Sequence, residues 1–190
     1  MNSVISSHSP QAVSQAVSVL NAGGLVGLPT ETVYGLAARA DIDAAVANIF
    51  RAKGRPTGHP LILHIADISE LDRYAFNVPS AALTLAQHCW PGPLTLLLHK
   101  TNAVSHLVTG GRETVAIRIP ANECSRKIIE QCGNALAAPS ANLFGHVSPT
   151  TAQHVLNDLG DKVHLIVDDG DCTIGVESTI VDFTTAQPQL

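Results

Sequence analysis

The stretch LVGLPTETVYGL, residues 25–36, decides the fold class of this chain. Its first four residues are apolar and predict a short buried strand, which Pro29 ends. Upstream, an apolar stripe of residues 12, 13, 16, 17 and 20 predicts an amphipathic helix that a glycine pair at 23–24 terminates. A helix that leads directly into a buried strand is typical of α/β proteins.

The second half of this stretch is polar where the strand ends. Thr30 and Thr32 supply hydroxyls there, and Glu31 supplies a carboxylate. Because a sheet holds the backbone rigid at such a point, these side chains are suited to binding a small polar ligand. A polar turn with a capping threonine explains the same residues, so both interpretations remain open.

Outward from this stretch, predicted helices and strands alternate along the chain. Ser9 is predicted to cap the first helix and Asp41 the second. The predicted helices cover about 10–22, 41–53, 78–88, 122–132 and 150–159. The predicted strands cover 25–28, 61–65, 94–98, 114–119, 135–138, 163–167 and 175–183, with a rigid WPGP turn at 90–93. This alternation predicts a single α/β domain over residues 1–190, built around a mixed sheet.

Composition limits the core and the class of partner. Of the 190 residues 45% are hydrophobic but only 4% are aromatic, so we expect a core of Ala, Val, Leu and Ile. Charged residues make up 14%, and the net charge is −5. This balance argues against a generally basic nucleic-acid-binding surface, although it leaves room for a local basic patch.

The cysteines and the hydropathy of the sequence indicate in which cellular compartment the protein is expected. The four cysteines show no CxxC spacing, and the chain does not start with a signal peptide, which predicts reduced thiols in a cytoplasmic protein. A Cys-His zinc site is the alternative interpretation of these residues. No apolar stretch approaches the ~20 residues that a membrane helix needs, so no membrane association is expected.

The familiar nucleotide-binding signatures are missing, so other segments must supply any such site. There is no GxxxxGK[ST] loop and no GxGxxG after a strand. Lys53 and Arg55, in a KGRP sequence at a predicted helix end, are either cations at a helix C-terminus or a polyphosphate clamp. His64 and Arg118 interrupt apolar strands, and they either point to solvent or line a cavity for an anionic ligand.

Small polar residues follow another predicted strand. Ser140, Asn142 and Ser148 could donate hydrogen bonds to phosphate oxygens, and Ser148 stands just before a predicted helix. An N-cap and a polar loop explain them equally well. Ser178 and Thr179 are hydroxyls predicted to lie in the middle of a strand.

Six motifs occur in a specific order between Gly24 and Asp182. They are PTETVYGL, KGRPxxHPLIxH, WPGPLTL, VAIRIP, APSANxxGxxSPT and ESTIVD. In this order they resemble the YrdC/TsaC family of threonylcarbamoyl-AMP synthases. The resemblance implies a twisted open mixed sheet with flanking helices and a large, positively lined central cavity. It also implies a nucleotidyltransferase that uses L-threonine, bicarbonate, ATP and Mg²⁺, and a downstream transferase that passes threonylcarbamoyl to tRNA.

The resemblance also assigns residues, although none as a metal ligand. It implies that Lys53 and Arg55 are catalytic. The ATP contacts it implies are Lys53, Arg55, His59, Thr114, Ser140, Asn142 and Ser148. The L-threonine contacts it implies are Thr32, His64, Arg118, Ala138 and Ser178, with Arg118 on the carboxylate. His59 departs from the family, because many relatives have Asn there.

A second departure concerns the C-terminal end. Relatives often carry an arginine shortly after the final strand that helps to hold the nucleotide, whereas this sequence stops at Leu190. We therefore expect a truncated or single-domain form that lacks a C-terminal extension or second domain.

Two rival functions remain. One is a non-catalytic module of the same fold that binds double-stranded RNA or tRNA, which the low Lys and Arg count of 11 disfavours. The other resembles the carbamoyl-adenylate-forming domain of hydrogenase maturation, but the zinc-finger and acylphosphatase modules that normally accompany it are missing from this sequence.

Overall fold

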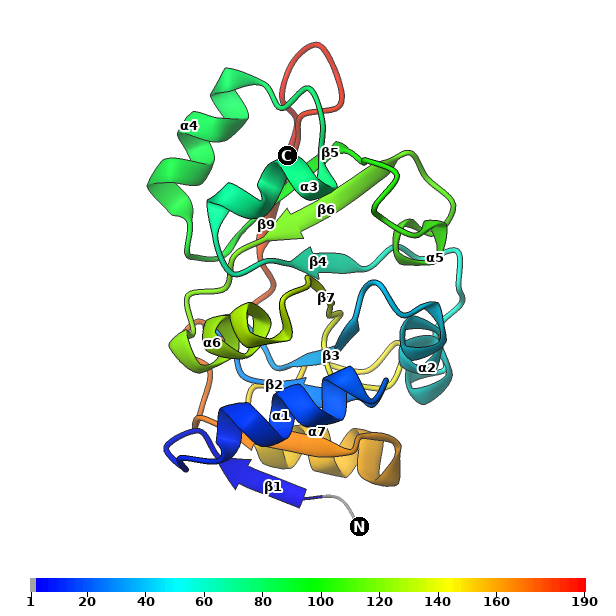
Figure 1. Ribbon diagram of the computed structural model, residues 1–190, viewed down its shortest axis with the longest axis vertical. Helices are drawn as coiled ribbons and strands as arrows, with labels where there is room; N and C mark the ends of the chain where they lie inside the picture. Colours follow the sequence, from blue (N-terminus) through cyan, green and yellow to red (C-terminus); the bar gives the residue numbers. More distant parts are fainter. Residues whose placement is uncertain (1–2) are drawn as a thin grey trace.

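Nine strands form one mixed sheet within residues 3–190, the part of the chain that the computed structural model describes (Figure 1). Their order across the sheet is β1-β8-β2-β3-β7-β4-β6-β5-β9. The strands are β1 (Ser3–Ser6), β2 (Val26–Leu28), β3 (Gly35–Arg39), β4 (Ile62–His64), β5 (Leu94–His99), β6 (Thr114–Arg118), β7 (Leu136–Ala137), β8 (Leu165–Asp168) and β9 (Thr179–Asp182). The predicted α/β fold with a mixed sheet is therefore confirmed.

The register of the sheet decides which polar residues meet. Strands β1, β8 and β2 run parallel, whereas β3 is antiparallel to both β2 and β7. Further across, β4 is antiparallel to β7 and parallel to β6, and β5 is antiparallel to β6 and parallel to β9. In the β4–β6 pair His64 lies directly opposite Arg118. The two polar residues that interrupt the predicted strands are therefore neighbours.

Helices cover both faces of the sheet. They are α1 (Ala12–Asn21), α2 (Asp43–Lys53), α3 (Leu71–Tyr74), α4 (Ser80–Cys89), α5 (His106–Thr109), α6 (Glu123–Cys132) and α7 (Ala152–Leu159), with 3₁₀ turns at Ile68–Glu70 and Gly160–Lys162. One core cluster packs α1 and α6 against the sheet, and another contains the buried residues of α2 and α7. Figure 1 shows α1 and α6 in front of the strands and α7 behind them.

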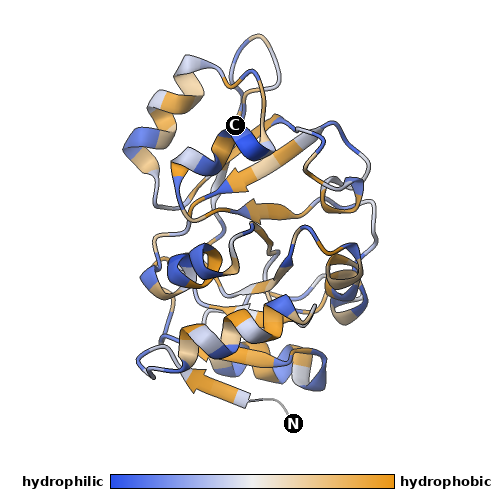
Figure 2. Cartoon of the chain, viewed as in Figure 1, coloured by the Kyte–Doolittle hydropathy of each residue, from blue (hydrophilic) through white to orange (hydrophobic). Residues whose placement is uncertain are grey.

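Strand alternation explains why two cores form. Along β3, Leu36 and Ala38 belong to the core of α2 and α7, whereas Ala37 belongs to the core of α1 and α6. Most buried residues are Ala, Val, Leu and Ile, as the composition predicts, and Figure 2 shows the apolar strands between amphipathic helices. No helix within residues 3–190 combines the length and the apolar character that crossing a membrane requires.

Several predicted details are wrong at the ends of elements. Helix α1 starts at Ala12 after a turn, so Ser9 is not its cap. Asp41 does not cap α2, because Arg39 at the end of β3 takes its carboxylate with two bonds of 2.9 and 2.6 Å. Strand β9 starts only at Thr179, which leaves Ser178 in the preceding loop instead of mid-strand. Strands β1 and β3 were not predicted.

Candidate functional site

Arg118 is held inside the protein at the end of β6. Its side chain is 4% exposed and forms an ion pair with Glu31, with 2.6 Å between Arg118 Nη2 and Glu31 Oε1. Arg118 Nε donates a second bond of 3.2 Å to the carbonyl of Gly92 in the WPGP turn. The interpretation that Arg118 points to solvent is therefore wrong, because the segments that carry Glu31 and Gly92 enclose the side chain.

His64 shares this buried environment and is uncharged. It is 6% exposed, and its Nδ1 lies 3.3 Å from the carbonyl oxygen of Ile62. Burial, together with the charge of Arg118, lowers the pKa of His64 to about 3. The solvent-exposed interpretation is wrong here as well. A neutral imidazole can donate one hydrogen bond and accept another at the ends of the central strands.

Three more predicted residues bond to the strands and turns next to this pair. Ala138 follows β7 and donates its N–H to the carbonyl of Ile62 at 3.0 Å. Thr32 is fully buried beside Glu31, with its hydroxyl 2.9 Å from that of Thr30. Ser178 lies with its hydroxyl 2.7 Å from that of Thr95 on β5. We call the set Thr32, His64, Arg118, Ala138 and Ser178 the strand-end group.

The turn that contains Thr32 has its own cap. Thr30 Oγ1 accepts bonds of 3.1 Å from the N–H groups of Thr32 and Val33 and donates to the Val33 carbonyl at 2.6 Å. The interpretation of a capping threonine is thus confirmed for Thr30. The Glu31 carboxylate takes no part in this cap and binds Arg118 instead.

A second set of predicted residues gathers on loops, around the end of α2. We call Lys53, Arg55, His59, Ser140, Asn142 and Ser148 the loop group. Its centre is Lys53, which is 2% exposed and whose ammonium donates to the carbonyls of Ser140 and Asn142, the latter at 2.6 Å. Burial, with a smaller contribution from the charge of Arg55, lowers the pKa of Lys53 to about 8.

Gly54 explains how the helix end allows this contact. It closes α2 in the left-handed conformation with φ of 64°, which glycine adopts without strain, while the N–H of Arg55 bonds back to Phe50. The chain therefore turns directly after Lys53. The prediction that a Gly residue stops the helix here is confirmed.

Arg55 and His59 meet at an aromatic ring. The guanidinium of Arg55 lies 5.8 Å from the centre of the Phe144 ring and donates to the Pro60 carbonyl at 2.9 Å. The ring of His59 packs edge-on against the same Phe144 at 5.2 Å. Arg55 Nε is buried without a hydrogen-bond partner within residues 3–190. Burial lowers the pKa of Arg55.

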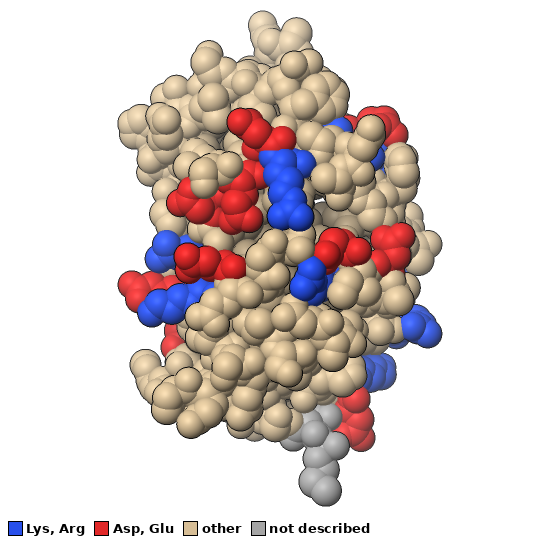
Figure 3. Space-filling view, in the orientation of Figure 1, with Lys and Arg blue, Asp and Glu red and all other residues tan. Residues whose placement is uncertain are grey.

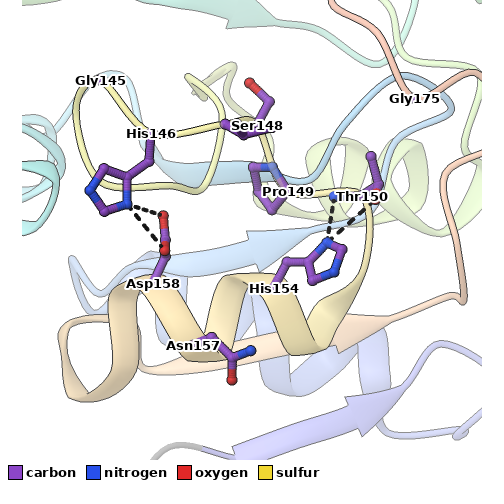
Figure 4. Close-up of a pocket in the computed structure, with 10 residues that line it drawn as sticks. Gly145, His146, Ser148, Pro149, Thr150, His154, Asn157, Asp158 and Gly175 are labelled. Atoms are coloured by element: carbon purple, nitrogen blue, oxygen red, sulfur yellow. Dashed lines mark hydrogen bonds and ion pairs between the residues drawn. The ribbon is translucent and has the colours of Figure 1, made fainter.

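Ser148 borders a cavity of about 650 Å³ next to α7 (Figure 4). The cavity is lined by residues 145–150, His154, Asn157, Asp158 and Gly175, and Ser148 alone among the predicted site residues is on its wall. The Ser148 hydroxyl donates to Glu177 at 2.5 Å. Ser148 does not stand at the helix N-terminus as expected, because Thr151 caps α7.

Thr114 lies at the far end of β6 from Arg118. It begins β6, four residues before Arg118, and pairs with His99 of β5. A strand rises about 3.3 Å per residue, so Thr114 lies roughly 13 Å from Arg118 along β6. The hydrogen bonds of the structure do not connect it to the loop group.

Two cations of the site, Lys53 and Arg118, are buried, whereas the surface carries charges of both signs. On the face shown in Figure 3, acidic and basic side chains are interspersed and most of the surface carries no charge. No group of three or more His, Cys, Asp or Glu side chains within residues 3–190 is arranged to hold a metal ion.

Proteins of known family resemble this chain over nearly its whole length. The Sua5/YciO/YrdC family model, described as telomere recombination, matches residues 18–190. The chain belongs to the Sua5/YciO/YrdC family. The resemblance that the six motifs indicate is thereby confirmed.

Curated relatives of this Sua5/YciO/YrdC chain carry a specific name. The threonylcarbamoyl-AMP synthase of Pyrococcus abyssi is 49% identical over 175 residues, which cover 92% of this chain and 52% of the relative. That of Bacillus subtilis is 48% identical over 187 residues, or 98% of this chain and 54% of the relative. This chain therefore spans about half the length of the curated relatives it matches.

A solved structure extends the comparison to three dimensions. The crystal structure of P. abyssi Sua5 complexed with L-threonine matches with a TM-score of 0.95 at 45% identity, over 99% of this chain and 56% of that chain. The fold expected of the family, a twisted open mixed sheet with flanking helices, is therefore confirmed for this member.

Three residues of this Sua5/YciO/YrdC site were missed as individual contacts. Glu31 holds Arg118, Thr95 holds Ser178, and Glu177 holds Ser148. Each of the three lies inside one of the quoted motifs, and that position was the feature of the sequence that could have identified it. Their partners lie 87, 83 and 29 residues away, so spacing along the chain does not reveal them.

Proposed function

We propose that this chain catalyses the formation of L-threonylcarbamoyl-AMP and pyrophosphate from L-threonine, bicarbonate and ATP. It would act as a nucleotidyltransferase. The observation that carries the proposal is a buried arginine beside a neutral histidine at the ends of two parallel strands, with a separate cationic loop group nearby. The names of the relatives support it, as does the crystallised complex of one of them with L-threonine.

The strand-end group fits an amino-acid substrate. Arg118 would bind the carboxylate of threonine, since guanidinium and carboxylate are matched in geometry and charge. His64, Thr32 and Ser178 supply neutral donors and acceptors for the hydroxyl and the amine. Thr32, His64 and Arg118 are buried, which would exclude water from their contacts.

The reaction needs positioning more than a protein nucleophile. The amine of threonine would form a bond to the carbon of bicarbonate, with loss of water, or of carbon dioxide, with loss of a proton, to give N-carboxythreonine. An oxygen of this new carboxylate would attack the α-phosphorus of ATP in line, and the bond to pyrophosphate would break. The protein would contribute alignment and charge stabilisation at the phosphates.

The loop group fits the phosphates of ATP, with a division of labour. Arg55 is only half-buried and would offset charge on the phosphates. Lys53, whose ammonium is bonded to the Ser140 and Asn142 carbonyls, would shape the loop that approaches the nucleotide. Thr114 and His59 remain predicted nucleotide contacts.

Mg²⁺ would be carried by the nucleotide. The carboxylates near the loop group are those of Glu177, which bonds to Ser148, and Asp158, which accepts from the N–H of Leu143. Two carboxylates that already have protein partners suit an ion held mainly by phosphate and water. Its chemistry would be to neutralise phosphate charge. The adenylate product is a reactive mixed anhydride, so a downstream transferase would have to pass its threonylcarbamoyl group to tRNA.

The test is pyrophosphate release by the 190-residue chain with ATP, Mg²⁺ and bicarbonate, with and without L-threonine. Release that requires both threonine and bicarbonate would support the proposal. Serine should be a poorer substrate rather than an inert one, because one methyl group contributes only about 1–3 kcal/mol of discrimination. Salt-sensitive binding of double-stranded RNA without threonine-dependent release would instead favour an RNA-binding module.

A further inference from the structure

Glu31 is a buried carboxylate at the centre of the site to which no substrate contact has been assigned. Its side chain is 11% exposed, and its Oε1 accepts a bond of 2.6 Å from Nη2 of Arg118. Its other oxygen, Oε2, accepts a bond of 2.9 Å from the N–H of Ala121. Both oxygens are therefore engaged, and Glu31 links β6 to the start of α6.

The backbone of Glu31 is fixed too. Its carbonyl accepts a bond of 2.9 Å from Ile174, and the next carbonyl, that of Thr32, accepts a bond of 3.0 Å from Gly175. The turn that carries Glu31 is thus anchored to the loop before β9. A carboxylate held at both oxygens and through its own backbone has little freedom to move away from Arg118.

Gly92 fixes the other side of the guanidinium. Its carbonyl accepts from Arg118 Nε at 3.2 Å, while its own N–H bonds to the Ile119 carbonyl. A Cβ at this position would lie 2.3 Å from the Cys89 carbonyl oxygen, so only glycine permits this path of the turn. Arg118 is therefore held by two acceptors from different segments.

These two contacts leave part of the guanidinium available. An arginine side chain has five N–H donors, and Arg118 uses one on Nε and one on Nη2. No residue within 3–190 accepts a hydrogen bond from its Nη1. Nη1 keeps both of its hydrogens and Nη2 keeps one, so three N–H donors remain, which we call the free fork and which suit a carboxylate.

We propose that Glu31 is a positioning residue, which orients Arg118 so that this free fork receives the carboxylate of the amino-acid substrate. The assignment rests on the proposed function, which supplies that substrate. Glu31 does not touch the reacting atoms. It acts through Arg118, whose guanidinium plane it fixes together with Gly92.

Replacement of Glu31 by glutamine should separate the orientation of Arg118 from the mere filling of space at position 31. Glu31→Gln keeps the size of the side chain, but its amide nitrogen must then face either Arg118 Nη2 or the Ala121 N–H, and both are donors. One of the two contacts is lost, and the fork of Arg118 is no longer held in place. Glu31→Asp keeps the charge and shortens the reach by one methylene.

The experiment measures L-threonine and L-threoninamide binding by calorimetry, and pyrophosphate release for the KM of each substrate. For Glu31→Gln we expect about a tenfold or greater loss in threonine affinity and a change of less than about threefold in the KM for ATP. The preference for threonine over its amide should collapse, because only the carboxylate uses the fork. Glu31→Asp should show the same pattern at about three- to tenfold.

Glu130→Gln is the matched control, since Glu130 is an exposed residue on α6 and should behave like the wild type. Thermal melting reports whether each variant folds, and Glu31→Asp decides the question if Glu31→Gln does not fold. Equal losses for threonine and threoninamide, or unchanged threonine affinity, would overturn the assignment. A wild-type chain without threonine binding or threonine-dependent release would instead overturn the proposed function, and the assignment with it.

Discussion

Arg118 and Arg55 are the two arginines that the proposed chemistry uses, and the protein holds them in different ways. Arg118 is 3% exposed and is fixed by Glu31 and by the Gly92 carbonyl. Arg55 is half-buried, has one hydrogen bond to the Pro60 carbonyl, and otherwise lies near the Phe144 ring, which is 44% exposed. The first arginine belongs to a sheet and the second to loops.

The difference matches the two substrates proposed for these groups. A sheet holds its strand ends rigidly, so the strand-end group presents a preset shape, which suits a small amino acid. Loops adjust more readily, and a flexible triphosphate with its metal ion needs such adjustment. Lys53 limits this freedom, because it ties α2 to the loop at Ser140 and Asn142. Variants that affect one group alone therefore test the comparison.

Arg55→Ala should have the largest effect. Removing a cation from developing charge at the phosphates should lower pyrophosphate release by about 10²–10³-fold, as expected for one electrostatic contact in a transition state. Thermal stability should change little, since Arg55 makes one hydrogen bond to protein. Steady-state kinetics at saturating threonine measures the effect.

Arg51→Ala is the control for this variant. Arg51 lies in the last turn of the same helix and is exposed, and within residues 3–190 its side chain bonds to that of Asn48 alone. Its loss should leave turnover within about twofold of the wild type. Near-normal turnover of Arg55→Ala would show that the loop group does not hold the phosphates through Arg55.

The pH dependence of the free energy of unfolding should show whether His64 in the strand-end group is shielded from water. His64 has a pKa of about 3 in the folded protein, below its ordinary value, so the unfolded chain binds the extra proton at acid pH. Stability should therefore fall as the pH drops below about 6.5, by roughly 2–3 kcal/mol down to pH 4.5 from this residue. Urea unfolding of the wild type and of His64→Gln at several pH values isolates the effect. Parallel curves would mean that water reaches His64.

The strand-end group shows how much of the site the sequence predicts. Strand alternation predicts that His64 and Arg118 share faces with small or apolar residues, but it does not say whether a second layer covers those faces. The cover comes from distant segments, the WPGP turn and the Glu31 turn. The local pattern therefore favours a solvent-exposed Arg118, and only the order of the six motifs favours an Arg118 that binds a ligand.

Helix ends show a similar limit. The stop of α2 at Gly54 was predictable, because a glycine followed by Arg-Pro is a local signal. The cap at Asp41 was not, since Arg39 competes for the same carboxylate once β3 forms. The inward turn of Lys53 was also beyond local pattern, because its acceptors stand 87 and 89 residues away.

Arg118→Lys should have a smaller and more selective effect. Lysine keeps the charge but loses the fork, so the KM for threonine should rise by about tenfold while the KM for ATP stays within about threefold. Initial rates with each substrate varied in turn measure the two constants. Equal effects on both would contradict the division between the strand-end group and the loop group.

Ser148→Ala should have the smallest effect of the series and tests where the loop group ends. The Ser148 hydroxyl donates to Glu177 at 2.5 Å and borders the cavity beside α7, so it touches the nucleotide only if ATP extends that far. A lost hydrogen bond at a partly exposed site should raise the KM for ATP by about two- to fivefold and leave that for threonine unchanged. Ser18→Ala, on the exposed side of α1, is the control for a hydroxyl lost elsewhere. An unchanged KM for ATP would show that the nucleotide binds near Lys53 and Arg55 without reaching Ser148. Ser148 would then keep its hydrogen bond to Glu177 when ATP is bound, instead of binding a phosphate.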